Sequence, residues 1–70
     1  MEPPWKACPD IEHGSIGWRM GRGEEIYDMF YRWFSDLSEV ERARFEAEHP
    51  EPKQWKGFYR MIAESPWKSN

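Results

Sequence analysis

One stretch of the chain, residues 24–37, carries the pattern that most restricts how this protein folds. Its large apolar side chains recur at three- and four-residue spacing, so they form one stripe on a helix that turns about 100° per residue. The stripe consists of Ile26, Met29, Phe30, Trp33 and Leu37. Phe34 lies at its edge, and Tyr27 and Tyr31 lie on its flank. The pattern predicts a core helix over residues 24–36.

The size of the chain limits what kind of core it builds. Its 70 residues make one domain at most, and a core of that size supplies only about 3–5 kcal/mol of net stability. A single cysteine, Cys8, excludes an intramolecular disulfide and leaves few ligands for a structural metal site. Five Trp, four Phe and three Tyr residues supply bulk instead, because each aromatic side chain buries about 150–250 Å². We therefore expect a single domain over residues 1–70.

The N-terminal third of the chain shows no helical pattern. Pro3, Pro4 and Pro9 fix φ and remove backbone donors, so residues 1–13 are expected to form an extended arm. Residues 14–23 contain four glycines, which disfavour a stable helix and favour tight turns or close backbone approach. We interpret this second segment as an ordered Gly-rich loop packed across the helices, with a short extended segment facing the core as the alternative.

Two more helices are expected after the first. Ser38 and Glu41 have the spacing of a capping box, which predicts a helix over residues 39–48. A proline at position 52 suits the start of a third helix, over residues 52–64. The apolar residues of this third helix recur at helical spacing: Trp55, Phe58, Tyr59 and Ile62.

The faces of the second predicted helix differ in character. Val40, Ala43 and Ala47 share one face, and their small size favours close approach by another helix. Phe45 lies about 140° away, so it is either exposed or covered by a different element. The fold class that follows is mainly α: a small three-helix domain with an extended Pro-rich N-terminal arm and an irregular Gly-rich segment.

Composition argues against several classes of protein. The chain has no apolar run of about 18 residues and no signal-peptide pattern at its start, so we expect a soluble, cytoplasmic protein that does not enter a membrane. A formal net charge of −3 disfavours a dedicated duplex-DNA binder. We expect neither catalysis nor a cofactor, because 70 residues hardly enclose a substrate pocket.

A minimal enzyme or metal protein centred on Cys8 and His13 is the least favoured hypothesis. Catalysis by a thiol needs a nearby base and an orienting group, and a structural zinc site needs four well-spaced Cys or His ligands. The sequence supplies neither set close to Cys8. We therefore expect no metal.

The excess of aromatic residues points to a binding surface. Several aromatic side chains lie off the predicted core stripes, and Trp, Tyr and Arg dominate the energetics of protein interfaces. The leading hypothesis is therefore a small non-enzymatic protein-binding module, an adaptor or inhibitor, whose partner is another protein or a second copy of the chain. Its candidate interface residues are Tyr27, Tyr31, Arg32, Phe45 and Trp67.

The alternative hypothesis is weak binding of single-stranded nucleic acid or phosphate. Basic residues on the predicted C-terminal helix, with Trp67 beside them, supply the charge and the stacking surface that such binding requires. These residues are Lys53, Lys56 and Arg60 on the predicted helix, with Lys68 beyond its end. The competing explanation is a solvated helix face on which Arg60 pairs with Glu64.

Overall fold

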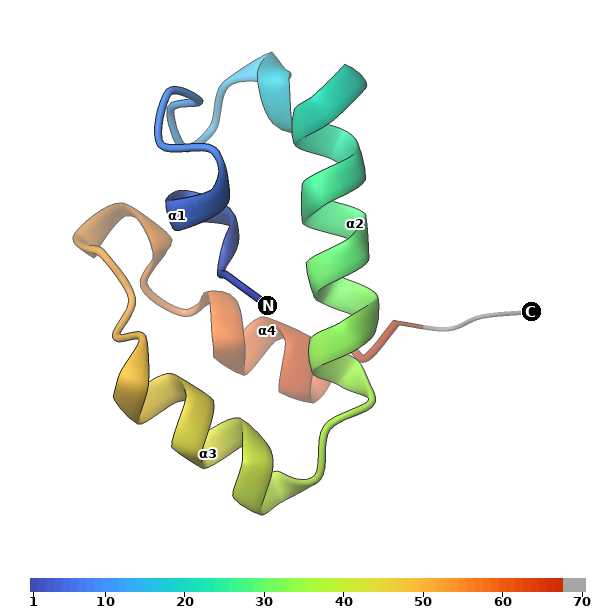
Figure 1. Cartoon of the computed structure of the whole chain (residues 1–70), viewed down its shortest axis with the longest axis vertical. Coiled ribbons are helices and arrows are strands. Elements are labelled where there is room, and N and C mark those ends of the chain that lie inside the picture. Colours follow the sequence, from blue (N-terminus) through green and yellow to red (C-terminus); the bar gives the residue numbers. More distant parts are fainter. Residues whose placement is uncertain (68–70) are drawn as a thin grey trace. The chain divides into compact units, whose positions relative to one another are not determined.

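A computed structural model describes residues 1–67 of the chain. The described part is mainly helical and contains no strand, which confirms the predicted mainly α class (Figure 1). Its helices in chain order are α1 (Pro4–Ala7), the 3-10 helix η1 (Ile16–Trp18), α2 (Gly21–Ser35), α3 (Glu39–Glu48), the 3-10 helix η2 (Lys53–Trp55) and α4 (Phe58–Glu64).

The chain divides into two compact units. Unit 1 is Met1–Phe30, and unit 2 begins at Tyr31. The boundary falls inside α2, so this helix contributes residues to both units. The expectation of one domain over residues 1–70 stays a prediction.

The N-terminal arm of unit 1 contains a helical turn. Pro4 occupies the first helical position of α1, where the N–H that proline lacks needs no partner. The amides of Lys6 and Ala7 both donate to the carbonyl of Pro3, at 2.9 and 3.0 Å. The prediction of an extended arm over residues 1–13 is therefore wrong for its first half, because a proline at this position starts a helix as readily as it prevents one.

The Gly-rich segment brings two backbones into direct contact. A Cβ atom built on Gly23 would lie 1.9 Å from the carbonyl oxygen of Gly17, and one built on Gly17 would lie 2.9 Å from a methyl carbon of Ile11. This confirms the predicted close backbone approach. The helix α2 begins at Gly21, three residues before the predicted position 24, and Gly21 takes a positive φ of 57° there.

The other residues of the Gly-rich segment do not form an extended strand. Ile16 and Met20 are 70% and 60% exposed, whereas Trp18 is buried and its indole N–H donates to the carbonyl of Glu12 at 3.0 Å. The alternative with all three apolar side chains facing the core is wrong. The turn of η1 rotates successive side chains by about 120°, which breaks the alternation of a strand.

We predict that Gly23→Ala destabilises the protein by about 1–3 kcal/mol, because the new methyl group collides with the Gly17 carbonyl. Without this collision, alanine would stabilise the helix by up to about 1 kcal/mol relative to glycine, so a loss of stability indicates the contact. Urea unfolding measures the change in the free energy of unfolding. Glu25→Ala, at an exposed position of the same helix, is the control and should change stability by less than about 0.5 kcal/mol. A Gly23→Ala variant as stable as the native protein would contradict the prediction.

Unit 2 has an aromatic core built around Phe45 of α3. The Phe45 ring contacts Trp33, Phe34 and Tyr59, with ring centroids 5.3, 5.9 and 6.1 Å away. Its side chain is only 8% exposed, so the expectation that this side chain is free for a partner is wrong. It also stacks on His49, at 4.3 Å between centroids.

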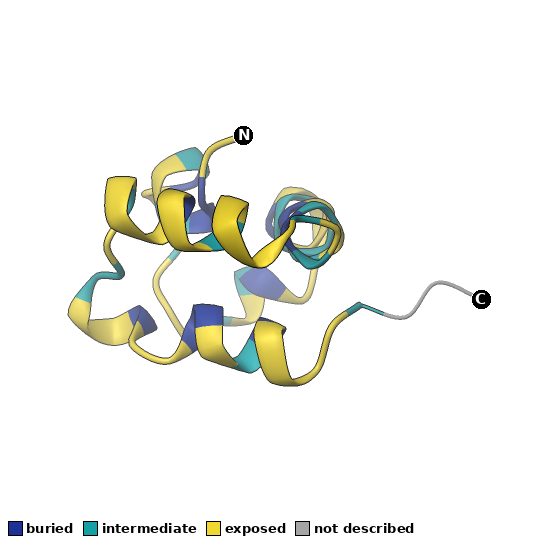
Figure 2. Ribbon diagram, turned by 90° about the horizontal axis from the view of Figure 1, so that it is seen from below, coloured by how far each residue is buried: buried dark blue, intermediate teal, exposed yellow. Residues whose placement is uncertain are grey.

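This packing buries the Phe45 face of α3 and leaves its small-residue face exposed, which is the reverse of the expected arrangement. Val40 is 70% exposed, and Ala43 and Ala47 are exposed as well, so the small-residue face is exposed and not buried. Figure 2 accordingly colours most of the α3 ribbon as exposed. The Phe45 ring lies on the inward side of α3 because the rings of Trp33 and Phe34 on α2 and of Tyr59 on α4 pack against it.

The N-terminus of α3 has the predicted capping box. The Ser38 hydroxyl accepts from the amide of Glu41 at 3.2 Å, and the Ser38 amide donates to the Glu41 carboxylate at 2.9 Å. The second of these bonds, followed by the Ser38 side chain, lowers the pKa of Glu41 below its usual 4.5. The bounds of the helix, Glu39–Glu48, are those predicted.

The third predicted helix is interrupted. Gly57 takes a φ of 94°, which separates η2 from α4, so one helix over residues 52–64 is wrong. No atom lies within 4 Å of a Cβ built on Gly57, so the glycine is required for its left-handed conformation. The Glu51 carboxylate caps α4 from outside, accepting from the amides of Gly57 and Tyr59 at 3.0 and 2.7 Å. The predicted apolar stripe of this segment is nevertheless buried at every position.

The prediction of the apolar stripe on α2 is only partly correct. Phe30 and Phe34 are both fully buried, although Phe34 was expected at the edge. Met29, expected in the core, is 56% exposed. The buried face is therefore rotated toward Phe34, the residue that packs on the aromatic rings of unit 2.

Tyr59 supplies a test of the core of unit 2 at alkaline pH. Its hydroxyl donates to the carbonyl of His49 at 2.7 Å, and burial, with smaller contributions from the charges of Glu51 and Glu46, raises its pKa above the usual 10. Below pH 10 the hydroxyl stays protonated in both the folded and the unfolded chain. Above pH 10 the unfolded chain loses this proton first, so stability falls.

We predict that Tyr59→Phe lowers the free energy of unfolding by about 0.5–1.5 kcal/mol at neutral pH, because one hydrogen bond is lost. The native protein should then lose stability more steeply than the variant as pH rises above 10. Urea unfolding at a series of pH values measures both effects. Parallel curves for the two proteins would contradict the assignment.

Candidate functional site

Three of the predicted interface residues come together in unit 2. Tyr31 and Arg32 lie in the last turns of α2, and Trp67 follows α4. The Tyr31 and Trp67 rings meet edge to face, with centroids 5.4 Å apart, and the Arg32 guanidinium carbon lies 5.3 Å from the Trp67 ring centroid. Together with the two serines described next, Ser35 and Ser65, these residues make up what we term the Trp67 cluster.

Two serines hold the cluster together. The Ser35 hydroxyl donates to the carbonyl of Tyr31 at 2.8 Å and accepts from the amide of Trp67 at 2.9 Å. The Tyr31 hydroxyl donates to the carbonyl of Ser65. These bonds attach the segment that follows α4 to the end of α2, although about 30 residues separate the two in sequence.

Exposure in the Trp67 cluster is uneven. Arg32 is exposed, whereas Tyr31 and Trp67 are half-buried. The indole Nε1 of Trp67 is buried and has no hydrogen-bond acceptor among residues 1–67. Leaving such a donor without an acceptor costs about 1–3 kcal/mol. The docked position of Trp67 is therefore held by ring contacts and its backbone amide, against an unfavourable contribution from its side-chain N–H.

The remaining predicted interface residues lie elsewhere. Tyr27 belongs to unit 1, where it is half-buried and its ring centroid lies 6.3 Å from that of Trp18. Phe45 lies in the core of unit 2. The structure therefore gathers Tyr31, Arg32 and Trp67 and does not add the other two to that cluster.

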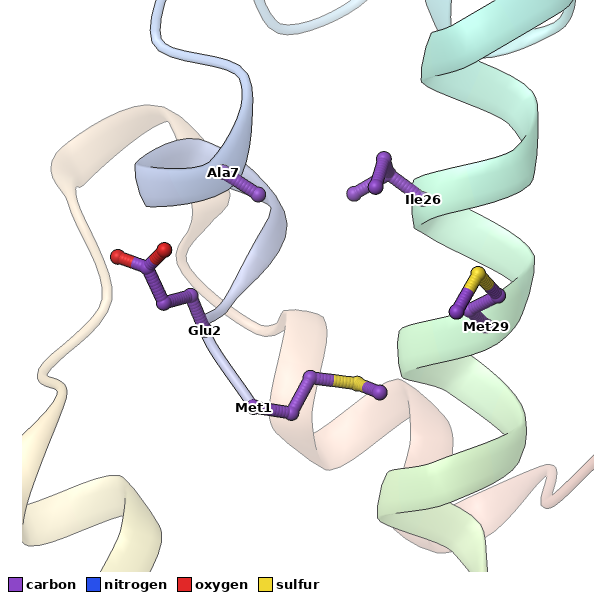
Figure 3. A pocket seen from close by; sticks show the side chains of 5 residues that line it. All are labelled: Met1, Glu2, Ala7, Ile26 and Met29. Atoms are coloured by element: carbon purple, nitrogen blue, oxygen red, sulfur yellow. The ribbon is translucent and has the colours of Figure 1, made fainter.

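A separate apolar pocket opens on unit 1. It is lined by Met1, Glu2, Ala7, Ile26 and Met29, and its volume is about 180 Å³ (Figure 3). In this view the side chains of Met1 and Ala7 point toward those of Ile26 and Met29 across the opening, and the Glu2 carboxylate points outward. No sequence pattern predicts this pocket, because the spacing of Met29 is that of a core residue and Met1 belongs to no apolar stripe.

The basic surface of the alternative hypothesis does not form on one helix. Lys53 lies in η2, Lys56 ends it, and only Arg60 lies in α4. The Arg60 guanidinium lies 3.6 Å from the Glu64 carboxylate, which is the predicted intrahelical pair. Lys68 lies outside the described residues. The break at Gly57 removes the regular helical spacing on which that surface depended.

Residues for metal or thiol chemistry are not assembled in the described part of the chain. Within residues 1–67, no group of three or more His, Cys, Asp or Glu side chains is placed to hold a metal ion. The Cys8 thiol is free and only 1% exposed. None of the described helices has the length and apolar character needed to cross a bilayer.

Comparisons with protein-family models, curated proteins and solved structures found no match to this chain.

The serines of the Trp67 cluster carry only a weak sequence signal. Ser35 follows Tyr31 by four residues, the spacing at which a serine hydroxyl bonds back to a helix carbonyl. Nothing in the sequence connects either residue to Trp67, because that contact depends on where the chain returns after α4.

We predict that Ser35→Ala releases Trp67 from the end of α2, because the Trp67 amide loses its acceptor. In a protein labelled with fluorotryptophan, whose five resonances report the five indoles, the Trp67 signal should move toward its unfolded position. Ser15→Ala removes a serine hydroxyl that accepts from a backbone amide in unit 1, and it should leave that signal unchanged. An unmoved Trp67 resonance in Ser35→Ala would show that the hydroxyl is not what holds the ring.

Proposed function

We propose that this chain is a small non-enzymatic protein-binding module, an adaptor or inhibitor, which meets its partner through the Trp67 cluster. The observation that carries the proposal is the placement of one Tyr, one Arg and one Trp side chain against each other at a solvent-exposed end of α2. These three residue types contribute most of the binding energy at protein interfaces.

The arrangement of charge and rings supports this proposal. The Arg32 guanidinium lies over the face of Trp67 and is exposed, so a partner carboxylate or carbonyl can reach its N–H donors. Tyr31 and Trp67 are half-buried, so part of each aromatic ring remains accessible to a partner. A rigid Tyr31 loses little conformational entropy on binding, because its hydroxyl is already bonded to Ser65.

A partner could supply a hydrogen-bond acceptor for the buried indole N–H of Trp67. Its N–H has no acceptor among residues 1–67, so a partner that draws the ring outward and offers a carbonyl removes an unfavourable contribution. The proposed location is the cytoplasm, in keeping with a single, unpaired cysteine. Phe45 is left out of the proposed surface because its side chain is buried.

The test is to compare what the native protein and Arg32→Ala bind. We expect Arg32→Ala to weaken the partner complex or the self-association by about fivefold or more, since truncating a hot-spot residue costs over about 1 kcal/mol. Affinity capture followed by titration of the captured partner measures the affinity of the partner complex. Sedimentation equilibrium measures the self-association.

Arg44→Ala is the matched control. Arg44 is also an exposed arginine of unit 2, on α3, and it lies outside the Trp67 cluster. Binding by Arg44→Ala should equal that of the native protein. If both variants retain every interaction of the native protein at full affinity, the Trp67 cluster is not its binding surface.

A further inference from the structure

The pocket of unit 1 keeps apolar side chains in contact with water. Met1 and Met29 are 55% and 56% exposed although they line a concave surface, and Ile26 and Ala7 are half-buried between them. Methionine side chains are flexible and polarizable, and they adapt to apolar groups of different shape. An open pocket edged by two such residues is suited to receive an apolar group from outside the chain.

The size of the pocket restricts that group to a single side chain. A volume of about 180 Å³ exceeds the cavity of about 150 Å³ that takes up benzene. It is smaller than the 300–1,000 Å³ or so of pockets that bind drug-sized ligands. One leucine, methionine or phenylalanine side chain fits this volume, whereas a cofactor does not.

The charge of unit 1 restricts which partner residues can lie beside the inserted apolar side chain. Residues 1–30 carry three basic and six acidic side chains, a formal charge of −3. Arg22, one of the three basic residues, is bound to Asp10 at 2.8 Å, which leaves Lys6 and Arg19 against five acidic groups. One of the five, Glu2, lines the pocket, and a second, Glu25, lies four residues, or about one helical turn, before the lining residue Met29 on α2.

We propose that this pocket is a docking site for a basic amphipathic segment of another protein, which inserts one apolar side chain between Met1 and Met29 and places lysine or arginine near Glu2 and Glu25. Apolar contact supplies the affinity of such a site, and the acidic edge selects the sign of the partner's charge. The site is distinct from the Trp67 cluster and does not depend on the function proposed for it.

The test follows the four methionine methyl groups by NMR in the full chain, because Met1 and Met29 line the pocket and Met20 and Met61 do not. The probe is an amphipathic helical peptide of about 18 residues with leucine on one face and lysine on the other. Its two controls are the same peptide with glutamate in place of lysine and vesicles of neutral phosphatidylcholine. We expect the lysine peptide to shift the Met1 and Met29 signals and to leave those of Met20 and Met61 unchanged.

Matched variants separate the pocket from the general charge of the unit. Met29→Lys should weaken binding of the lysine peptide about tenfold or more, because it removes an apolar contact and adds a like charge. Met20→Lys makes the same substitution at a residue that is also exposed but lies outside the pocket, and it should weaken binding by less than about threefold.

Four results with the native protein would overturn the proposal: no shift at Met1 and Met29, equal shifts at all four methionines, equal binding of the glutamate peptide, or a response to vesicles alone. The last would indicate a lipid-binding surface instead. Equal weakening by Met29→Lys and Met20→Lys would also overturn it, since only the net charge would then matter. Arg32→Ala should leave peptide binding intact, so failure here and failure of the Trp67 cluster are distinguishable.

Discussion

The packing of Phe45 against Phe34 and Tyr59 is the constraint on which unit 2 depends. These three rings come from α3, α2 and α4, and their centroids lie between 5.1 and 6.1 Å apart. Each such pair contributes about 0.5–1.5 kcal/mol beyond the area that it buries. In a chain without a disulfide in its described part, these contacts supply the cohesion that a larger aliphatic core gives to bigger domains. The same packing fixes the end of α2, from which Tyr31, Arg32 and Ser35 project.

Unit 1 depends on a different kind of contact. Here the backbone of Gly23 in α2 lies against the carbonyl of Gly17, and Ile11 packs beside both. A Cβ atom at either glycine would come too close to a neighbouring atom. Packing in unit 1 therefore depends on glycines that allow close contact, whereas packing in unit 2 depends on large aromatic rings. This contact also sets the position at which α2 can begin, and with it the register of Ile26 and Met29 at the pocket.

The two candidate surfaces differ in how they would gain energy on binding. The Trp67 cluster is already assembled by hydrogen bonds and ring contacts, and one of its donors lacks an acceptor. A partner there would complete an existing polar arrangement. The pocket of unit 1 is open and apolar, with Glu2 as its one acidic lining residue, so a partner there would remove methionine side chains from water. The first favours a specific hydrogen-bonding partner, and the second favours any basic segment with an apolar side chain of suitable size.

Local sequence determined the helical class, the capping box at Ser38, the bounds of α3 and the buried stripe from Trp55 to Ile62, because each depends on spacing within a few residues. Tertiary structure decided the rest. The sequence shows that Phe45 and the small residues of α3 lie on different faces, but only the rings of α2 and α4 decide which face is buried. Nothing in the sequence indicates that Ser35 and Trp67 are in contact. Their hydrogen bond forms only because the chain returns to the end of α2 after α4. Met29 has the spacing of a core residue yet remains exposed, since burial depends on what packs against a side chain and not on its periodicity alone.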